Sequence, residues 1–187
     1  MKESLRERLI IAGMDEITHY GIANFSLRRV AAACNTSCAA PYKHFKNKDE
    51  FILEIVRYIN LRWELLRDQV WALFDSDKQK QLVEICVAYI RFWIANPNYR
   101  SILSAGDGIF GTDINKNVVE SVSIENLIRQ YCEESGGVDE EETERRIVAV
   151  KAITYGVTTM LEHGELRNTP KTFEYIRKIF ENELSLP

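Results

Sequence analysis

Three adjacent side chains near the N-terminus are of types that bind anionic oxygens: Tyr42, Lys43 and His44. A phenol, an ammonium group and an imidazole can each donate a hydrogen bond to a phosphate, and a lysine also reaches the acceptor atoms of guanine. Lys48 adds a second cation four residues after His44. These residue types at this spacing favour contact with the backbone and base edges of a nucleic acid.

The segment that must position these residues reads as two short helices joined by a tight turn. Ser26 is a typical N-cap, and apolar residues repeat at helical spacing over 27–33. The pattern breaks at Asn35, a residue type that tolerates the left-handed conformation ending many helices. Ser37 is predicted to cap a second helix over about 37–44. In a helix-turn-helix, the second helix enters the major groove of DNA while the first crosses the backbone, so the sequence predicts a DNA-binding unit.

Composition and charge agree with this prediction. The chain of 187 residues has 45% hydrophobic and 28% charged residues, which is typical of a globular protein. Its formal net charge is −4, but residues 1–50 hold eight Lys and Arg against six Asp and Glu, whereas residues 51–187 carry a net −6. Phosphate binding needs only a local cationic surface. No apolar run is long enough for a membrane span or a signal peptide, so we expect a cytoplasmic protein that does not bind membranes.

The remaining sequence is helical in pattern nearly throughout, and no strand pattern or repeat appears. We therefore expect an all-α fold with a three-helix DNA-binding domain over residues 1–47 and a helical domain over residues 48–187. The only glycine-rich stretch, around 105–113, lacks the spacing of a phosphate-binding loop. The predicted helices cover about 5–20, 27–33, 37–44, 48–74, 77–95, 98–104, 116–134, 139–163 and 170–184.

The helix predicted over 139–163 has two apolar stripes. One comprises Ile147, Val150, Thr154, Val157 and Leu161, and the other comprises Val148, Ala152, Tyr155 and Thr159. One stripe can cover the core of the domain, so the other needs a second partner. With the last helix nearby, the pattern predicts a homodimer through the last two long helices, which form a four-helix interface around a two-fold axis.

Aromatic residues are concentrated in the central helices of the second domain. Any one of them could simply belong to the core, but together they suggest an apolar cavity lined by aromatic rings, which is the usual form of a small-ligand site. The expected effector is an apolar or aromatic small molecule of unknown identity. The candidate ligand-binding residues are Trp63, Tyr89, Trp93, Phe110, Tyr131 and Tyr155.

Two motifs in the N-terminal region resemble the tetracycline-repressor (TetR) family of bacterial regulators. They are SLRRVA at 26–31 and the run Tyr42-x-His44-Phe45-x-Asn47-Lys48-x-Glu50. The resemblance implies an N-terminal DNA-binding unit and a C-terminal helical domain that dimerises and encloses a ligand. Carried over by position, the expected DNA-binding residues are Ser26, Arg28, Ser37, Cys38, Ala39, Ala40, Tyr42, Lys43, His44 and Lys48.

The sequence departs from this family's pattern at three places. Asn35 stands in the turn where a glycine is common, and Arg29 stands where a Glu would complete a capping box with Ser26. Pro41 and the paired alanines before it leave few donors for direct base contacts. Sequence choice would then depend on thymine methyl groups and on DNA shape.

These observations favour a ligand-responsive repressor that releases its DNA operator when a small molecule binds the second domain. One alternative is a DNA-binding activator or co-regulator without a small-molecule ligand. A helical-bundle enzyme is disfavoured, because His19, His44 and His163 are scattered and form no metal or catalytic constellation; we expect no cofactor. Cys34 and Cys38 could form a redox or metal pair, but we favour small structural residues because no CxxC motif is present.

Overall fold

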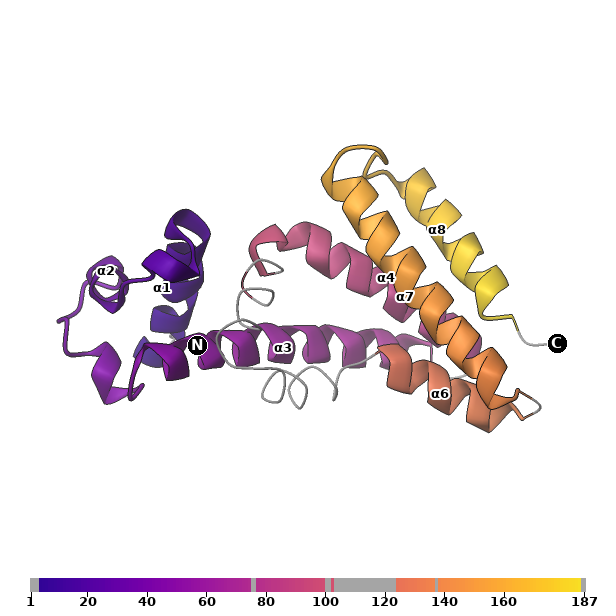
Figure 1. Ribbon diagram of the computed structural model, residues 1–187, viewed down its shortest axis with the longest axis horizontal. Helices are drawn as coiled ribbons and strands as arrows, with labels where there is room; N and C mark the ends of the chain where they lie inside the picture. Colours follow the sequence, from indigo (N-terminus) through magenta and orange to yellow (C-terminus); the bar gives the residue numbers. More distant parts are fainter. Residues whose placement is uncertain (1–3, 75–76, 100–101, 103–123, 137, 186–187) are drawn as a thin grey trace. The chain divides into compact units, whose positions relative to one another are not determined.

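The structure is a computed structural model that describes residues 4–74, 77–99, 102, 124–136 and 138–185. Every regular element in these ranges is helical, which confirms the predicted all-α class (Figure 1). The chain forms two compact units, one with residues 1–62 and 96–119 and the other with residues 63–95 and 120–187. Helix α3 (Lys48–Leu73) contributes residues to both units.

In the first unit, α1 (Leu5–Tyr20) and α2 (Leu27–Ala33) have the predicted bounds. Gly21, with φ 73°, ends α1 and begins the short 3-10 helix η1 (Ile22–Asn24). The core between α1 and α3 is tight, because a Cβ at Gly13 would lie 2.9 Å from Phe51 Cζ and 3.0 Å from Ile55 Cδ1. This glycine therefore permits the close approach of the two helices.

Asn35 ends α2 as expected from the sequence. Its φ is 54°, and the N–H groups of Asn35 and Thr36 donate to the carbonyl oxygens of Ala32 and Ala31, each over 3.0 Å. These two bonds form a Schellman motif, in which a residue in the left-handed region reverses the chain and satisfies the last carbonyls of the helix. The chain then leaves α2 toward the segment that carries Tyr42.

The predicted second helix over 37–44 is wrong in type and length. The structure has turns at 38–39 followed by the 3-10 helix η2 (Pro41–Lys43). Pro41 has no N–H, so it cannot return an α-helical hydrogen bond to the Ser37 carbonyl. The Ser37 oxygen instead accepts from the N–H of Ala40 at 2.9 Å, which is 3-10 spacing.

The second unit is a bundle formed by the end of α3 and four further helices: α4 (Lys78–Ala95), α6 (Ile124–Ser135), α7 (Glu140–Glu162) and α8 (Pro170–Glu183). Asp77, Asp139 and Thr169 cap α4, α7 and α8 through side-chain oxygens. Helices α7 and α8 lie side by side in Figure 1, in orange and yellow. The predicted core stripe of α7 is confirmed, since Ile147, Val150, Thr154, Val157 and Leu161 are all buried.

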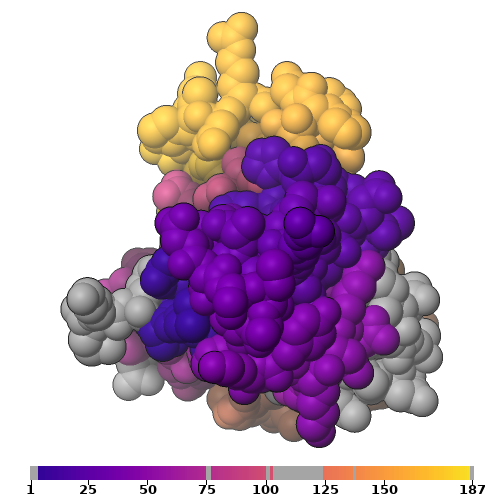
Figure 2. Space-filling view, turned by 90° about the vertical axis from the view of Figure 1, so that its left-hand side faces the viewer, coloured from indigo at the N-terminus to yellow at the C-terminus, as the bar shows by residue number. Residues whose placement is uncertain are grey.

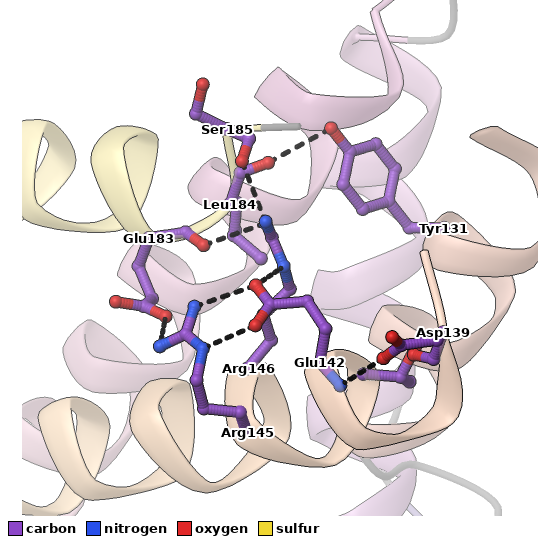
Figure 3. A network of polar contacts seen from close by, with 9 residues as sticks. Tyr131, Asp139, Glu142, Arg145, Arg146, Glu183, Leu184 and Ser185 are labelled. Carbon is purple, nitrogen blue, oxygen red and sulfur yellow. Dashed lines mark hydrogen bonds and ion pairs between the residues drawn. The ribbon is translucent and has the colours of Figure 1, made fainter. Parts of the chain in front are cut away.

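The C-terminal end of α8 is held by two side chains from other helices (Figure 3). Arg146, which is buried in α7, donates to the carbonyl oxygens of Glu183 at 3.0 Å and Ser185 at 2.9 Å. The Tyr131 hydroxyl donates to the Leu184 carbonyl at 3.1 Å. Three carbonyl groups at the helix end are thus satisfied by donors that the helix itself lacks.

Within the described residues, no helix is both long enough and apolar enough to cross a membrane.

Candidate nucleic-acid interface

Most of the predicted DNA-binding residues lie on the outside of the first unit, whose surface is indigo and purple in Figure 2. Tyr42 is 59% exposed, which is unusual for an aromatic side chain in a tightly packed unit. Its backbone is nevertheless fixed, because η2 lies between the buried residues Ala40 and Phe45. The exposed members of the predicted set are Arg28, Ser37, Cys38, Ala39, Tyr42, Lys43 and His44.

Ala40, in contrast, is a buried member of the predicted DNA-binding set. It is only 6% exposed, so its methyl group packs inward and is not available to a base. The adjoining Pro41 is also buried. The inward turn of these two residues anchors η2 and directs the exposed side chains of Tyr42 and Lys43 away from the core.

Ser26 and Lys48 are partly buried and already have partners within the unit. The Ser26 hydroxyl accepts from the N–H of Arg29 at 3.4 Å. The Lys48 ammonium donates to the Ile22 carbonyl at 3.1 Å and lies 5.8 Å from the centre of the Phe25 ring. An ammonium has three donors, so Lys48 can keep this bond and still contact a phosphate.

The beginning of α3 explains the spacing of Asn47, Lys48 and Glu50 in the motif. The Asn47 side-chain oxygen accepts from the N–H of Glu50 at 2.8 Å, and the Glu50 carboxylate accepts in turn from the N–H of Lys46. This reciprocal pair satisfies two N–H groups at the start of the helix. The sequence signal for this cap is the N-x-x-E pattern at residues 47–50.

The predicted ligand-binding residues divide into two groups. Trp63, Tyr89 and Trp93 form one aromatic cluster with Phe92 in the second unit, with ring centres between 5.0 and 5.7 Å apart. Within the described part of the chain, the indole Nε1 atoms of Trp63 and Trp93 are buried without a hydrogen-bond acceptor.

Of the other three predicted ligand-binding residues, Tyr131 and Tyr155 have other surroundings. Tyr131 holds the end of α8, and burial raises the pKa of its phenol. Tyr155 is 55% exposed on α7, and Phe110 lies outside the described residues. The ligand-binding role of all six residues stays a prediction, and the two tryptophans and Tyr89 are the members that contact one another in one cluster.

The sequence over residues 9–55 matches the model of the bacterial regulatory proteins of the TetR family. This match covers α1, α2, η2 and the start of α3, which are the elements that position the exposed residues above. Residues 9–55 therefore have the sequence of a TetR-family DNA-binding domain. Members of this family are transcription regulators that bind DNA operators, not enzymes.

Solved structures match the whole chain at low sequence identity, and they support the TetR fold of both units. A protein of unknown function from Rhodococcus sp. RHA1 is 21% identical, with a TM-score of 0.74 over 99% of this chain and 97% of its own. A TetR family transcription regulator from Marinobacter aquaeolei VT8 is 16% identical, with a TM-score of 0.70 over 96% and 94%. The fatty acid degradation regulator FadR from Bacillus halodurans is 14% identical, with a TM-score of 0.72 over 98% and 96%. No curated protein matches the sequence significantly.

Proposed function

We propose that this protein is a dimeric TetR-family repressor that releases its operator when a small molecule binds the second unit. The observation that carries the DNA-binding part is the exposure of Arg28, Tyr42, Lys43 and His44, which lie in the segments on either side of the turn at Asn35. Within the described ranges, Arg28 and Lys43 have no ion-pair partner, so both are free to neutralise phosphates. The exposed Cys38 and Ala39 would then face the groove.

The dimer is supported by the second apolar stripe on α7. Val148 and Tyr155 are 64% and 55% exposed, and their seven-residue spacing places them on one face of the helix. Tyr175 and Ile179 are exposed on the neighbouring α8. Exposed apolar residues contiguous over two adjacent helices mark a protein interface, and two copies of this pair would form a four-helix bundle. Each DNA-binding unit would make only a few contacts, so useful affinity requires two units, and a dimer supplies the second one.

The effector part rests on the aromatic cluster of Trp63, Tyr89 and Trp93. A buried indole N–H without an acceptor costs free energy, and a ligand that brings an acceptor oxygen would recover it. The proposed effector is therefore an apolar or aromatic molecule with at least one hydrogen-bond acceptor. Helix α3 carries Trp63 and also begins directly after η2, so it is the proposed path from the effector to the DNA-binding unit. Coupling of about 1.4–2.8 kcal/mol would give ten- to hundredfold release.

The DNA-binding proposal is tested by changing Tyr42 and Lys43 separately. The probe is a duplex of about 30 base pairs selected from a random pool by the wild-type protein, long enough for two half-sites. We expect Tyr42→Ala and Lys43→Ala each to weaken binding about tenfold, and the Lys43 change to reduce the slope of log affinity against log salt by about one. The matched control is Lys80→Ala, an exposed lysine on α4. Unchanged affinity in both test variants would contradict the assignment.

The effector proposal is tested with 8-anilinonaphthalene-1-sulfonate, an aromatic anion whose oxygens can accept an indole hydrogen bond. We expect it to quench tryptophan fluorescence, and Trp63→Phe and Trp93→Phe to weaken its binding about fivefold each, because phenylalanine keeps a ring but lacks the donor. Trp71→Phe is the control, since Trp71 lies outside the cluster and contacts Lys78. Equal affinities in all three variants would exclude the cluster as the site.

A further inference from the structure

Helix α2, which would cross the DNA backbone, cannot be stable by its own contacts. It has seven residues, whereas isolated helices shorter than about 12–15 residues are marginal in water. Its local cap is also incomplete. Ser26 accepts a long hydrogen bond of 3.4 Å from the N–H of Arg29, and Arg29 occupies the position from which a Glu or Gln would return a bond to the Ser26 N–H.

A carboxylate from α1 takes the place of this missing side chain. Glu16 is only 7% exposed, and its Oε1 accepts from the Ser26 N–H at 3.1 Å and from Arg29 Nε at 2.7 Å. The Ser26 N–H therefore has an acceptor on another helix. Arg29 stands where the local capping acid would be, and it pairs with Glu16, the carboxylate that takes over that role. An acid at the start of a helix also favours the helix dipole.

At the C-terminal end of α2, α1 supplies a cation. Arg8, two turns before Glu16 in α1, donates from Nη2 to the carbonyl oxygen of Cys34 at 2.8 Å, and the Cys34 thiol donates to the Arg8 carbonyl at 3.4 Å. Cys34 is the C-cap of α2 and precedes the turn at Asn35. An anion thus lies at the N-terminus and a cation at the C-terminus of a single short helix, which is the favourable arrangement at both ends.

Arg29 has partners within the first unit, although its side chain is 45% exposed. Its Nη2 donates to the Asn24 carbonyl at 2.5 Å, and its guanidinium carbon lies 4.3 Å from the centre of the Tyr20 ring. The hydrogen bond with Glu16 raises the pKa of Arg29 above its ordinary value. The neighbouring Arg28 is exposed and has none of these contacts.

We propose that Glu16 and Arg8 are positioning residues that clamp α2 at its two ends, and that Arg29 is the partner of Glu16 and not a phosphate ligand. The inference rests on the proposed DNA-binding function, because the clamp fixes Ser26 and Arg28 where they would meet the DNA backbone. It also explains how SLRRVA begins a helix without a local capping box. If the proposal is correct, a substitution within α2 that restores a local capping box should make Glu16 dispensable.

The test compares Glu16→Leu with the double variant Glu16→Leu/Arg29→Gln, which rebuilds the local box as Ser26-x-x-Gln and leaves the net charge unchanged. Binding to the selected duplex is measured across a salt series at a temperature where circular dichroism shows both proteins folded. We expect Glu16→Leu to bind about tenfold more weakly and to reduce the slope of log affinity against log salt by about one, which corresponds to the loss of one phosphate contact. The double variant should recover the wild-type affinity and slope. If Glu16→Leu does not fold, Glu16→Gln, which keeps the acceptor, should show a loss of about threefold.

A loss of stability alone is controlled by Glu54→Gln. Glu54 in α3 pairs with Arg6 of α1, so this change weakens the same unit without touching α2. It should leave the salt slope unchanged. A wild-type slope in Glu16→Leu, or a reduced slope in Arg29→Gln alone, would overturn the proposed clamp. Failure of the wild-type protein to bind any duplex at low ionic strength would instead contradict the proposed function.

Discussion

Replacing Val148 and Tyr155 together by glutamate is expected to convert the protein into a monomer that binds its duplex about 100- to 10,000-fold more weakly. Both side chains are largely exposed in the single chain, so the substitution leaves the core of the second unit intact. Four carboxylates in a two-fold interface would be desolvated without partners, which disfavours association. A monomer has only one DNA-binding unit, so it loses the affinity that a dimer gains by binding two half-sites at once.

Light scattering and a duplex titration on the same samples check this prediction. Leu73→Glu is the matched control, because Leu73 is 75% exposed but lies on α3 and outside the stripe. It should stay dimeric and bind as the wild type does. A Val148→Glu/Tyr155→Glu protein that remains dimeric would place the interface elsewhere.

Gly13→Ala is expected to destabilise the first unit by about 2 kcal/mol, the middle of the range for an overpacked core. The new methyl group would lie 2.9 Å from Phe51 Cζ and 3.0 Å from Ile55 Cδ1, so α1 and α3 must separate. Alanine is the better helix former by about 1 kcal/mol, but that gain is smaller than the cost of the clash. We expect the melting temperature of this unit to fall by about 10 °C in a calorimetric scan.

Gly156→Ala provides the opposite case. A Cβ at Gly156 meets nothing within 4 Å in the single chain, so in the monomeric Val148→Glu/Tyr155→Glu protein it should raise the stability of the second unit by up to about 1 kcal/mol. Stabilisation by Gly13→Ala, or equal effects of the two changes, would contradict the close packing of α1 on α3.

The sequence was most informative where the determinants are local. Apolar spacing and caps gave the bounds of α1, α2 and α3 to within a residue, and Asp77, Asp139 and Pro170 marked the starts of later helices. Asn35 was expected in the left-handed region, and it is there. The predicted start of the helix over 116–134 and the helix over 98–104 lie mostly outside the described residues, where α6 is seen only from Ile124.

The failures concern contacts between segments far apart in the chain. Nothing near Arg29 in the sequence indicates that Glu16 would complete the cap of α2, because the two side chains meet only after α1 and α2 pack. The sequence likewise did not indicate that the Tyr131 hydroxyl would donate to the carbonyl of Leu184, 53 residues away. The segment over 37–44 was predicted as a second helix from the cap at Ser37, whereas it takes 3-10 geometry over Pro41–Lys43 because Pro41 has no N–H.

Bound DNA should protect Cys38 from alkylation if the exposed residues of the first unit contact the duplex. Cys38 is exposed beside Tyr42, whereas Cys34, Cys86 and Cys132 are buried. Burial raises the pKa of Cys34, and it raises that of Cys86 to about 12, so these thiols should react slowly in the folded protein. We expect one rapidly alkylated thiol, that of Cys38. Saturating duplex at low salt should slow its alkylation at least about tenfold, and high salt, which dissociates the DNA, should restore the rate. An unchanged alkylation rate at Cys38 in a protein that is fully bound to duplex would show that DNA lies on another face.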